Sequence, residues 1–251
     1  MIDNHLITKH STQNSKNYFT LDLHGARKTL SLSGTPLLIE TIRADGKTGS
    51  THPCTPNFAN KDNQFDLPQH GPARTALWKV VTETEDSITF VYSVEGGIYP
   101  SGLKITQTAR ITDRFELYTI HTYTGMEPAP LIFGEHCYWD TFLGINDLKI
   151  NNIELKQLKD FQHTFNTTGI VVPLELVNTL EIPGKPTIQL EQENMPVAVV
   201  WRGMGDAKYV CIEPVTMNPQ VDSEGTSYFG SVKSLIKPGE TKTTYFSIML
   251  K

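Results

Sequence analysis

Hydrophobic and polar residues alternate with a period of two along much of this chain. The clearest alternation covers residues 18–23, 29–33, 103–112 and 114–124, and short apolar runs bounded by turn residues follow at 131–138, 148–155, 197–201 and 209–212. A period of two places successive side chains on opposite faces of a β-strand. Many short strands with turn signals between them predict an all-β protein, with a β-sandwich or barrel as one domain over residues 1–251.

Finer features follow from the same pattern. Hairpins are expected around Gly25–Ala26, around residues 85–87, and around Lys237–Gly239, where residues 231–236 would pair with 241–250 as a closing hairpin. Proline, glycine and asparagine crowd residues 48–66, which predicts a loop. The spacing of Leu158, Phe161 and Phe165 predicts one short helix.

Composition and charge exclude several functional classes. The formal net charge is -5 and no basic block occurs, so nucleic-acid binding has no electrostatic support. No apolar run is long enough to span a membrane, and the first sixteen residues are polar and lack a signal-peptide core. The three cysteines, Cys54, Cys137 and Cys211, are an odd and small set, which is typical of free thiols in a reducing cytosol. We therefore expect a cytoplasmic protein without a nucleic-acid or membrane partner.

A first candidate for chemistry is the stretch from Leu67 to Trp78. It carries His70 and Arg74 on a segment stiffened by Pro68 and Pro72 and bent at Gly71. The pattern predicts a rigid loop that leads into a strand at about Thr75. Loops on a rigid scaffold often carry catalytic groups, although an exposed histidine and a surface arginine explain this stretch alone equally well.

Two further stretches carry candidate groups. Along residues 133–140, strand alternation would place His136, Tyr138 and Asp140 on one face, and Glu135, Cys137 and Trp139 on the other. For His136 a hydrogen-bonded core histidine is as good an interpretation as a functional one. In the third stretch Glu213 ends the apolar run 209–212 and precedes Pro214. Partial burial would raise the pKa of this carboxyl toward neutrality, which suits a general base, whereas a glutamate in water at a strand end is the alternative.

Taken together, the stretches around His70, His136 and Glu213 resemble the aldose 1-epimerase family of galactose mutarotase-like proteins. The resemblance implies a large antiparallel β-sandwich, called a supersandwich, that interconverts the α and β anomers of free sugars without a cofactor. It implies that Glu213 takes the proton from the anomeric hydroxyl, that His136 protonates the ring oxygen and that His70 polarises this oxygen. Arg74 would hold a sugar hydroxyl or the Glu213 carboxylate, Tyr138 would contact the small-molecule sugar, and the chain would act as a monomer or homodimer.

The chain also departs from that family. Asn57 matches part of an Asn-Arg pair but has no arginine beside it, and Asn178 stands where an aspartate that binds sugar hydroxyls is expected. A hexose 6-phosphate mutarotase, with Arg43, Lys47 or Arg74 on the phosphate, and a sugar-binding protein without turnover therefore stay open as alternatives. A zinc site built from His52, Cys54, His70, His136 and Cys137 is disfavoured, because His136 and Cys137 would point to opposite faces and no Cys-x-x-Cys spacing occurs. No metal is expected.

Overall fold

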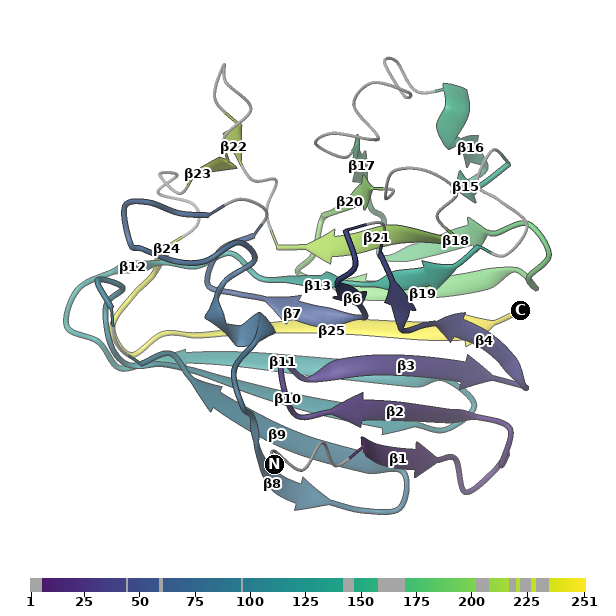
Figure 1. Cartoon of the computed structure of the whole chain (residues 1–251), viewed down its shortest axis with the longest axis horizontal. Coiled ribbons are helices and arrows are strands. Elements are labelled where there is room, and N and C mark those ends of the chain that lie inside the picture. The colour runs from purple at the N-terminus through teal and green to yellow at the C-terminus, as the bar shows by residue number, and fades with distance from the viewer. Residues whose placement is uncertain are drawn as a thin grey trace.

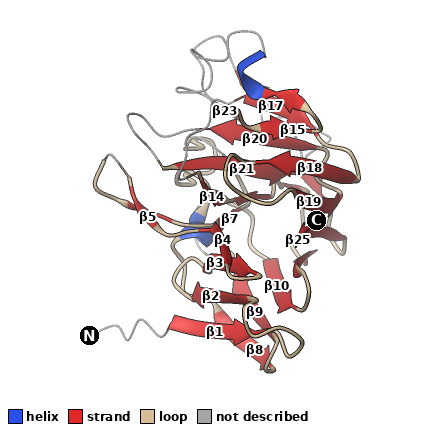
Figure 2. Cartoon of the chain, turned by 90° about the vertical axis from the view of Figure 1, so that its right-hand side faces the viewer, coloured by secondary structure: helices blue, strands red, loops and turns tan. Residues whose placement is uncertain are grey.

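Strands make up most of the molecule. The computed structural model describes residues 6–43, 45–58, 61–95, 97–141, 147–157, 170–201, 208–216, 220–221, 227–228 and 235–251. Over these residues the only helical elements are two single turns of 3-10 helix, η1 (Pro72–Arg74) and η2 (Leu155–Gln157), shown in blue in Figure 2. Within the same ranges, no helix has the length and apolar character needed to cross a membrane. The predicted all-β class is confirmed.

The first large sheet carries the amino-terminal strands. Its hydrogen-bonded order is β1 (Leu6–His10), β2 (Tyr18–Asp22), β3 (Arg27–Leu32), β4 (Thr35–Leu38), β14 (Tyr138–Asp140), β21 (Tyr209–Val215), β13 (Gly134–His136) and β7 (His52–Cys54). Two more strands extend it, because β20 (Val197–Trp201) pairs with β21 and β17 (Ile170–Pro173) pairs with β20. Strands distant in sequence thus meet at the centre of this sheet, around β21.

The second large sheet has nine strands. Their order is β16 (Ile153–Glu154), β15 (Lys149–Ile150), β18 (Val177–Glu181), β19 (Ile188–Glu193), β25 (Thr241–Leu250), β11 (Phe115–Tyr123), β10 (Leu103–Ile111), β9 (Ser87–Ser93) and β8 (Lys79–Glu83). Three small pairs complete the described strands: β5 (Thr41–Ile42) with β6 (Thr48–Gly49), β12 (Ala129–Pro130) with β24 (Leu235–Ile236), and β22 (Gln220–Val221) with β23 (Ser227–Tyr228). Figure 1 shows the long strands β8–β11 and β25 beside the purple strands β1–β4.

The two large sheets pack face to face, as a sandwich. On β10 every second side chain from Leu103 to Ile111 is buried, as its alternation predicted. On β11 the same rule buries the alternate side chains from Phe115 to Tyr123. Phe19 of β2 meets Phe115 of β11 edge-on with ring centroids 5.4 Å apart, so aromatic side chains of both sheets share one core. The predicted antiparallel sandwich is confirmed.

A buried ion pair crosses this core. The Lys28 ammonium on β3 donates to Glu135 Oε1 on β13 at 2.8 Å, and both side chains are 1% exposed. Gln107 on β10 of the other sheet joins them: its amide nitrogen donates to Glu135 Oε2 at 3.3 Å and its amide oxygen accepts from Lys28. Thr119 Oγ1 accepts from the same amide nitrogen at 3.0 Å. Gln107, the one polar residue in the inward row of β10, thus completes a polar network.

The structure corrects two expectations about local elements. Residues 48–66 are not simply a loop, because β6 and β7 lie within them. The closing hairpin is wrong as well: β25 pairs with β11 and β19, while the described end of its expected partner, β24, pairs with β12. The backbone N–H of Gly239, in the turn before β25, donates instead to Tyr123 O at the end of β11. The predicted helix at 158–165 lies outside the described residues.

Replacing Lys28 by methionine should destabilise the fold strongly. The change removes one partner of a buried ion pair and leaves the Glu135 carboxylate without its counter-charge, which costs about 3–5 kcal/mol of unfolding free energy. Urea denaturation of both proteins measures the difference. A matched control is Lys61→Met, because Lys61 and Asp66 are exposed at 59% and 67% and such a pair contributes at most about 1 kcal/mol. Equal stability of the Lys28→Met protein and its parent would contradict this account.

Candidate active site

Strand alternation places His136 of β13 and His52 of β7 on the face of the first sheet that points away from the core. Glu135 faces the second sheet through Gln107, so its neighbour His136 projects from the opposite face of β13. Strands β7 and β13 pair in a register that sets His52 directly opposite His136. The predicted division of this segment into two faces is borne out by the packing, because Trp139 belongs to the main core whereas Tyr138 packs in a separate small cluster with Tyr209 and Cys211.

The third histidine comes from the loop before η1. His70 and Gly71 both adopt left-handed backbone angles, with φ of 64° and 75°. Gly71 is required there, because a Cβ atom would lie 2.1 Å from the carbonyl oxygen of Thr55. The loop is held by Asn57, whose amide nitrogen donates to Pro68 O at 3.0 Å, and by Trp78, whose indole nitrogen donates to Ala73 O at 3.1 Å. A 3-10 turn follows His70, so the strand expected at Thr75 begins only at Lys79.

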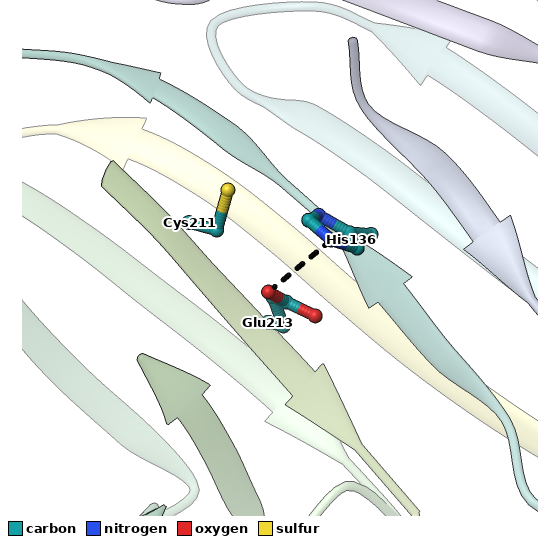
Figure 3. Close-up of side chains that lie close together, drawn as sticks. All are labelled: His136, Cys211 and Glu213. Carbon is teal, nitrogen blue, oxygen red and sulfur yellow. Dashed lines mark ion pairs between the residues drawn. The ribbon is translucent and has the colours of Figure 1, made fainter. Parts of the chain in front are cut away.

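The carboxylate of the site comes from β21. Glu213 sits opposite Val199 of β20 and is 3% exposed, so the predicted partial burial is in fact nearly complete. Its Oε1 atom lies 3.5 Å from Nε2 of His136 (Figure 3). This is the edge of hydrogen-bonding distance, and a proton placed between the two atoms can be held by either. The structure therefore brings together His70, His136 and Glu213, which lie far apart in the sequence.

The rings around His136 form a compact group. His52 stacks on it with centroids 4.9 Å apart, and Tyr138 stacks on it at the same separation with an interplanar angle of 14°. His70 meets it edge-on, also at 4.9 Å. We call His52, His70, His136 and Glu213 the histidine cluster. Among the described residues, Nε2 of His52 and Nδ1 of both His70 and His136 are buried without a hydrogen-bond partner. Buried nitrogens in this state are available to a ligand.

Two arginines bring positive charge close to the histidine cluster. Arg74, at the end of η1, acts on all four members of the cluster: it disfavours the protonated imidazoles and favours the Glu213 carboxylate. Arg43, next to the β5–β6 pair, stacks its guanidinium 5.6 Å from the ring centre of Trp201 and forms an ion pair with Asp45 at 3.2 Å. The prediction that Arg74 contacts substrate or carboxylate stays open to test.

Burial sets the protonation of these groups. It raises the pKa of the Glu213 carboxyl well above its usual range, with Arg74 opposing the rise. Burial and the neighbouring imidazoles of His52 and His70 lower the pKa of His136 far below its ordinary value. Both shifts favour the uncharged forms, a protonated Glu213 carboxyl beside a neutral His136 imidazole.

Of the predicted sugar-binding residues, the structure brings some to the histidine cluster and not others. Tyr138 stacks on His136, and Asn57 supports the loop that carries His70. Asn178 lies in the other sheet, fully buried, where its side chain bonds Asn151 and both backbone groups of Glu175. The Asn178 side chain therefore stabilises the turn at Glu175 in the second sheet, and sugar binding by Asn178 stays a prediction.

Other residues at the cluster escaped the sequence analysis. His52 was considered only as a metal ligand, because its strand β7 lies in a segment rich in turn residues. Trp201 and Tyr209 looked like ordinary members of apolar strands. The ring centroid of Trp201 lies 6.5 Å from that of His136, and the ring centroid of Tyr209 lies 5.2 Å from that of Tyr138. Cys211 lies close enough to both His136 and Glu213 for the three to hold a metal ion. Only the pairing of β7, β13, β20 and β21 reveals these neighbours.

Comparison with known proteins supports the fold and leaves the activity to be tested. No model of a protein family matches the sequence, and no curated protein matches it. Solved structures do match over nearly the whole chain. A galactose mutarotase-like protein from Lactobacillus casei superposes with a TM-score of 0.76 at 15% identity, over 98% of this chain and 100% of that one.

Two further structures agree. A proposed aldose 1-epimerase from Escherichia coli K12 gives a TM-score of 0.74 at 19% identity, covering 98% of this chain and 99% of its own. A galactose mutarotase related enzyme from Lactobacillus acidophilus gives 0.74 at 16% identity, over 98% and 97%. The chain has the galactose mutarotase-like fold. The fold implied by the sequence resemblance is thereby confirmed, although identities this low establish architecture and not substrate or turnover.

The His70 imidazole should remain neutral in mildly acidic solution. Burial and Arg74 lower its pKa from 6.5 to about 3 in the folded protein, whereas an unfolded histidine titrates near pH ~6.5. The stability that neutral His70 contributes is therefore present above pH ~6.5 and is lost as the pH falls toward the folded pKa. NMR of the imidazole signals, assigned with His70→Gln, measures the midpoint. A midpoint near pH ~6.5 in the folded protein would contradict the described burial.

Proposed function

We propose that this chain is an aldose 1-epimerase that interconverts the α and β anomers of a free aldose without a cofactor. The observation that carries the proposal is the 3.5 Å contact between His136 Nε2 and Glu213 Oε1, with His70 packed edge-on against the same imidazole. Anomer exchange needs a proton to leave one sugar oxygen while another is delivered to the ring oxygen. One carboxyl and one imidazole that share a proton are sufficient for this exchange.

The protonation of the pair suits both directions of the reaction. In ring opening, the Glu213 carboxylate takes the proton of the anomeric hydroxyl and protonated His136 gives its proton to the ring oxygen. The pair is then neutral, which is the form that burial favours. The aldehyde turns about its bond to the next carbon, Glu213 returns a proton to the carbonyl oxygen, and His136 takes one from the closing hydroxyl.

The remaining groups of the site fit a polar, ring-shaped substrate. His70 would donate to the ring oxygen and help to polarise it, and Arg74 favours the carboxylate form of Glu213 that starts ring opening. Tyr138 and Trp201 offer aromatic surface next to His136, and aromatic rings pack against the apolar faces of sugars. Asn57 contributes by holding the His70 loop.

A hexose 6-phosphate is a second candidate substrate. The observation in its favour is the pair of guanidinium groups, Arg43 and Arg74, that act electrostatically on His136 from different elements. Arginine binds phosphate oxygens well because its planar group donates several hydrogen bonds. Against this, Asp45 already neutralises part of the Arg43 charge. A third possibility, a sugar-binding protein without turnover, is favoured by no separate observation and is an outcome of the test.

Anomer equilibration measured by NMR or polarimetry distinguishes these candidates. Freshly dissolved glucose, galactose, xylose and glucose 6-phosphate are each followed with and without the protein. Acceleration for a free sugar supports the first proposal, and acceleration confined to glucose 6-phosphate supports the second. Binding of a sugar without acceleration would identify a sugar-binding protein, and neither binding nor acceleration with any of them would contradict the proposed function.

Glu213→Gln should reduce the rate of anomer exchange by roughly a hundredfold or more, because it removes the proton acceptor while keeping the shape of the side chain. The fold should be retained, since burial already favours the neutral form of Glu213. The matched control is Glu181→Gln, which carries the same substitution at the partly exposed surface ion pair with Lys149. Exchange at the parental rate in Glu213→Gln would remove this carboxyl from the mechanism.

His136→Gln should also slow exchange by about a hundredfold, since it removes the imidazole that moves the second proton. The matched control is His121→Gln. His121 is a buried histidine that packs against Phe133, and its pKa is lowered to about 3 by burial. A comparable loss of activity in both variants would indicate damage to the fold instead of a catalytic role. Circular dichroism and thermal unfolding of each variant accompany the rate measurements.

A further inference from the structure

The proposed catalytic pair has a third neighbour, the thiol of Cys211. Cys211 and Glu213 are two residues apart on β21 and therefore project from the same face, toward His136 on β13. One nitrogen of His136, the sulfur of Cys211 and one oxygen of Glu213 all lie within 4.8 Å of one another, and all three residues are buried (Figure 3). Nitrogen, sulfur and carboxylate oxygen in such a group are a ligand set that divalent zinc prefers.

We propose that His136, Cys211 and Glu213 bind a zinc ion, and that the bound ion blocks the catalytic pair. Zinc bonds of about 2.0–2.3 Å in a tetrahedral site place neighbouring ligand atoms roughly 3.3–3.7 Å apart. His136 Nε2 and Glu213 Oε1 are already 3.5 Å apart. The sulfur has to approach by at most about 1.5 Å, which a rotation of buried side chains can supply.

A second feature next to this trio is also suited to a cation. His52 stacks on His136, is 3% exposed, and has an Nε2 atom without a hydrogen-bond partner among the described residues. Its other nitrogen, Nδ1, contacts Ser50 O at 2.7 Å and so carries the proton, which leaves the lone pair on Nε2. A buried nitrogen lone pair gains from a metal ion, or from a water molecule that the ion holds.

Charge neutrality explains why the nearby arginines do not exclude the ion. Arg43 and Arg74 both act on this region and disfavour added positive charge. Zinc binding converts the Cys211 thiol to a thiolate and requires Glu213 as a carboxylate, with any proton that they hold released to solvent. The two anionic ligands cancel the two charges of the ion. Replacing Cys211 therefore removes a ligand and also leaves a net positive charge in a buried site.

The argument against zinc from the sequence did not include this thiol. It considered Cys54 and Cys137, and Cys137 indeed lies beside Glu135 and Lys28 on the core side of the sheet. Cys211 reaches His136 only because β13 and β21 are neighbours in the sheet. The inhibitory consequence rests on the proposed function, because it assumes that His136 and Glu213 move the protons. The binding of zinc does not depend on that assumption.

Cobalt substitution tests the metal site directly. Co²⁺ is titrated into the purified full chain, and the near-ultraviolet charge-transfer absorption of a thiolate-bound cobalt ion is followed, with zinc then displacing the cobalt. We expect one equivalent to produce this absorption in the parent and in Cys137→Ser, and Cys211→Ser to lack it. Loss of even an outer partner weakens metal affinity by roughly 10- to 100-fold, so loss of the thiolate should weaken zinc binding by about 100-fold or more.

Absence of the absorption in the parent, or its persistence in Cys211→Ser, would overturn the proposed site. If Cys211→Ser does not fold, Cys211→Ala is used, and the spectrum of the parent remains decisive on its own. Anomer exchange gives the second measurement: zinc should slow exchange by the parent, whereas the rate of Cys211→Ser, whatever its zinc-free value, should be unchanged by the same zinc concentration. Inhibition that is equal in both proteins would overturn the blocking role. A thiolate–cobalt spectrum in a protein that exchanges no tested sugar would contradict the proposed function alone.

Discussion

The buried ion pair between Lys28 and Glu135 determines how the rest of the site is presented. It lies between the sheets, where Gln107 of the second sheet completes its hydrogen bonds. Charges in such surroundings are tolerated only when they are paired and hydrogen-bonded, so Glu135 has to face inward. Because successive side chains on a strand point to opposite faces, His136 then has to face outward. The orientation of the His136 imidazole is in this way a consequence of core electrostatics one residue earlier.

Removal from water shifts the pKa values of the histidine cluster toward the uncharged forms of its side chains. His136 and Glu213 are driven toward neutral forms by the same removal from water, one by loss of a proton and the other by retention of one. The ionic and the neutral form of the pair differ by the transfer of one proton between Nε2 of His136 and Oε1 of Glu213, which lie 3.5 Å apart. Arg74 opposes the effect of burial on the Glu213 pKa and so reduces the free-energy difference between the ionic and the neutral form of the pair. The same neutral, thiol-lined arrangement offers ligands to a soft cation, because Cys211 stands beside the pair.

The architecture and the chemistry have different kinds of support. Solved structures match nearly the full length of the chain, with TM-scores of 0.74 to 0.76, although only 15–19% of residues are identical in those alignments. A sandwich of this kind tolerates such divergence because alternation and core volume maintain it. Functional groups have no such tolerance, and in this chain His52 and Cys211 lie beside the proposed catalytic residues.

The sequence by itself determined the all-β class, most long strands, the inward row of β10 and the three stretches that carry His70, His136 and Glu213, because period-two alternation and turn residues are local signals. It misplaced the partner of β25 and could not show what lies next to His136, because strand pairing is a non-local choice made by the whole core. Asn178 looked like a sugar ligand by position and is instead bonded within the other sheet. Only the tertiary structure decided that His52 and Cys211 lie next to His136 and Glu213, since they come from strands β7 and β21 that become neighbours of β13 through backbone hydrogen bonds.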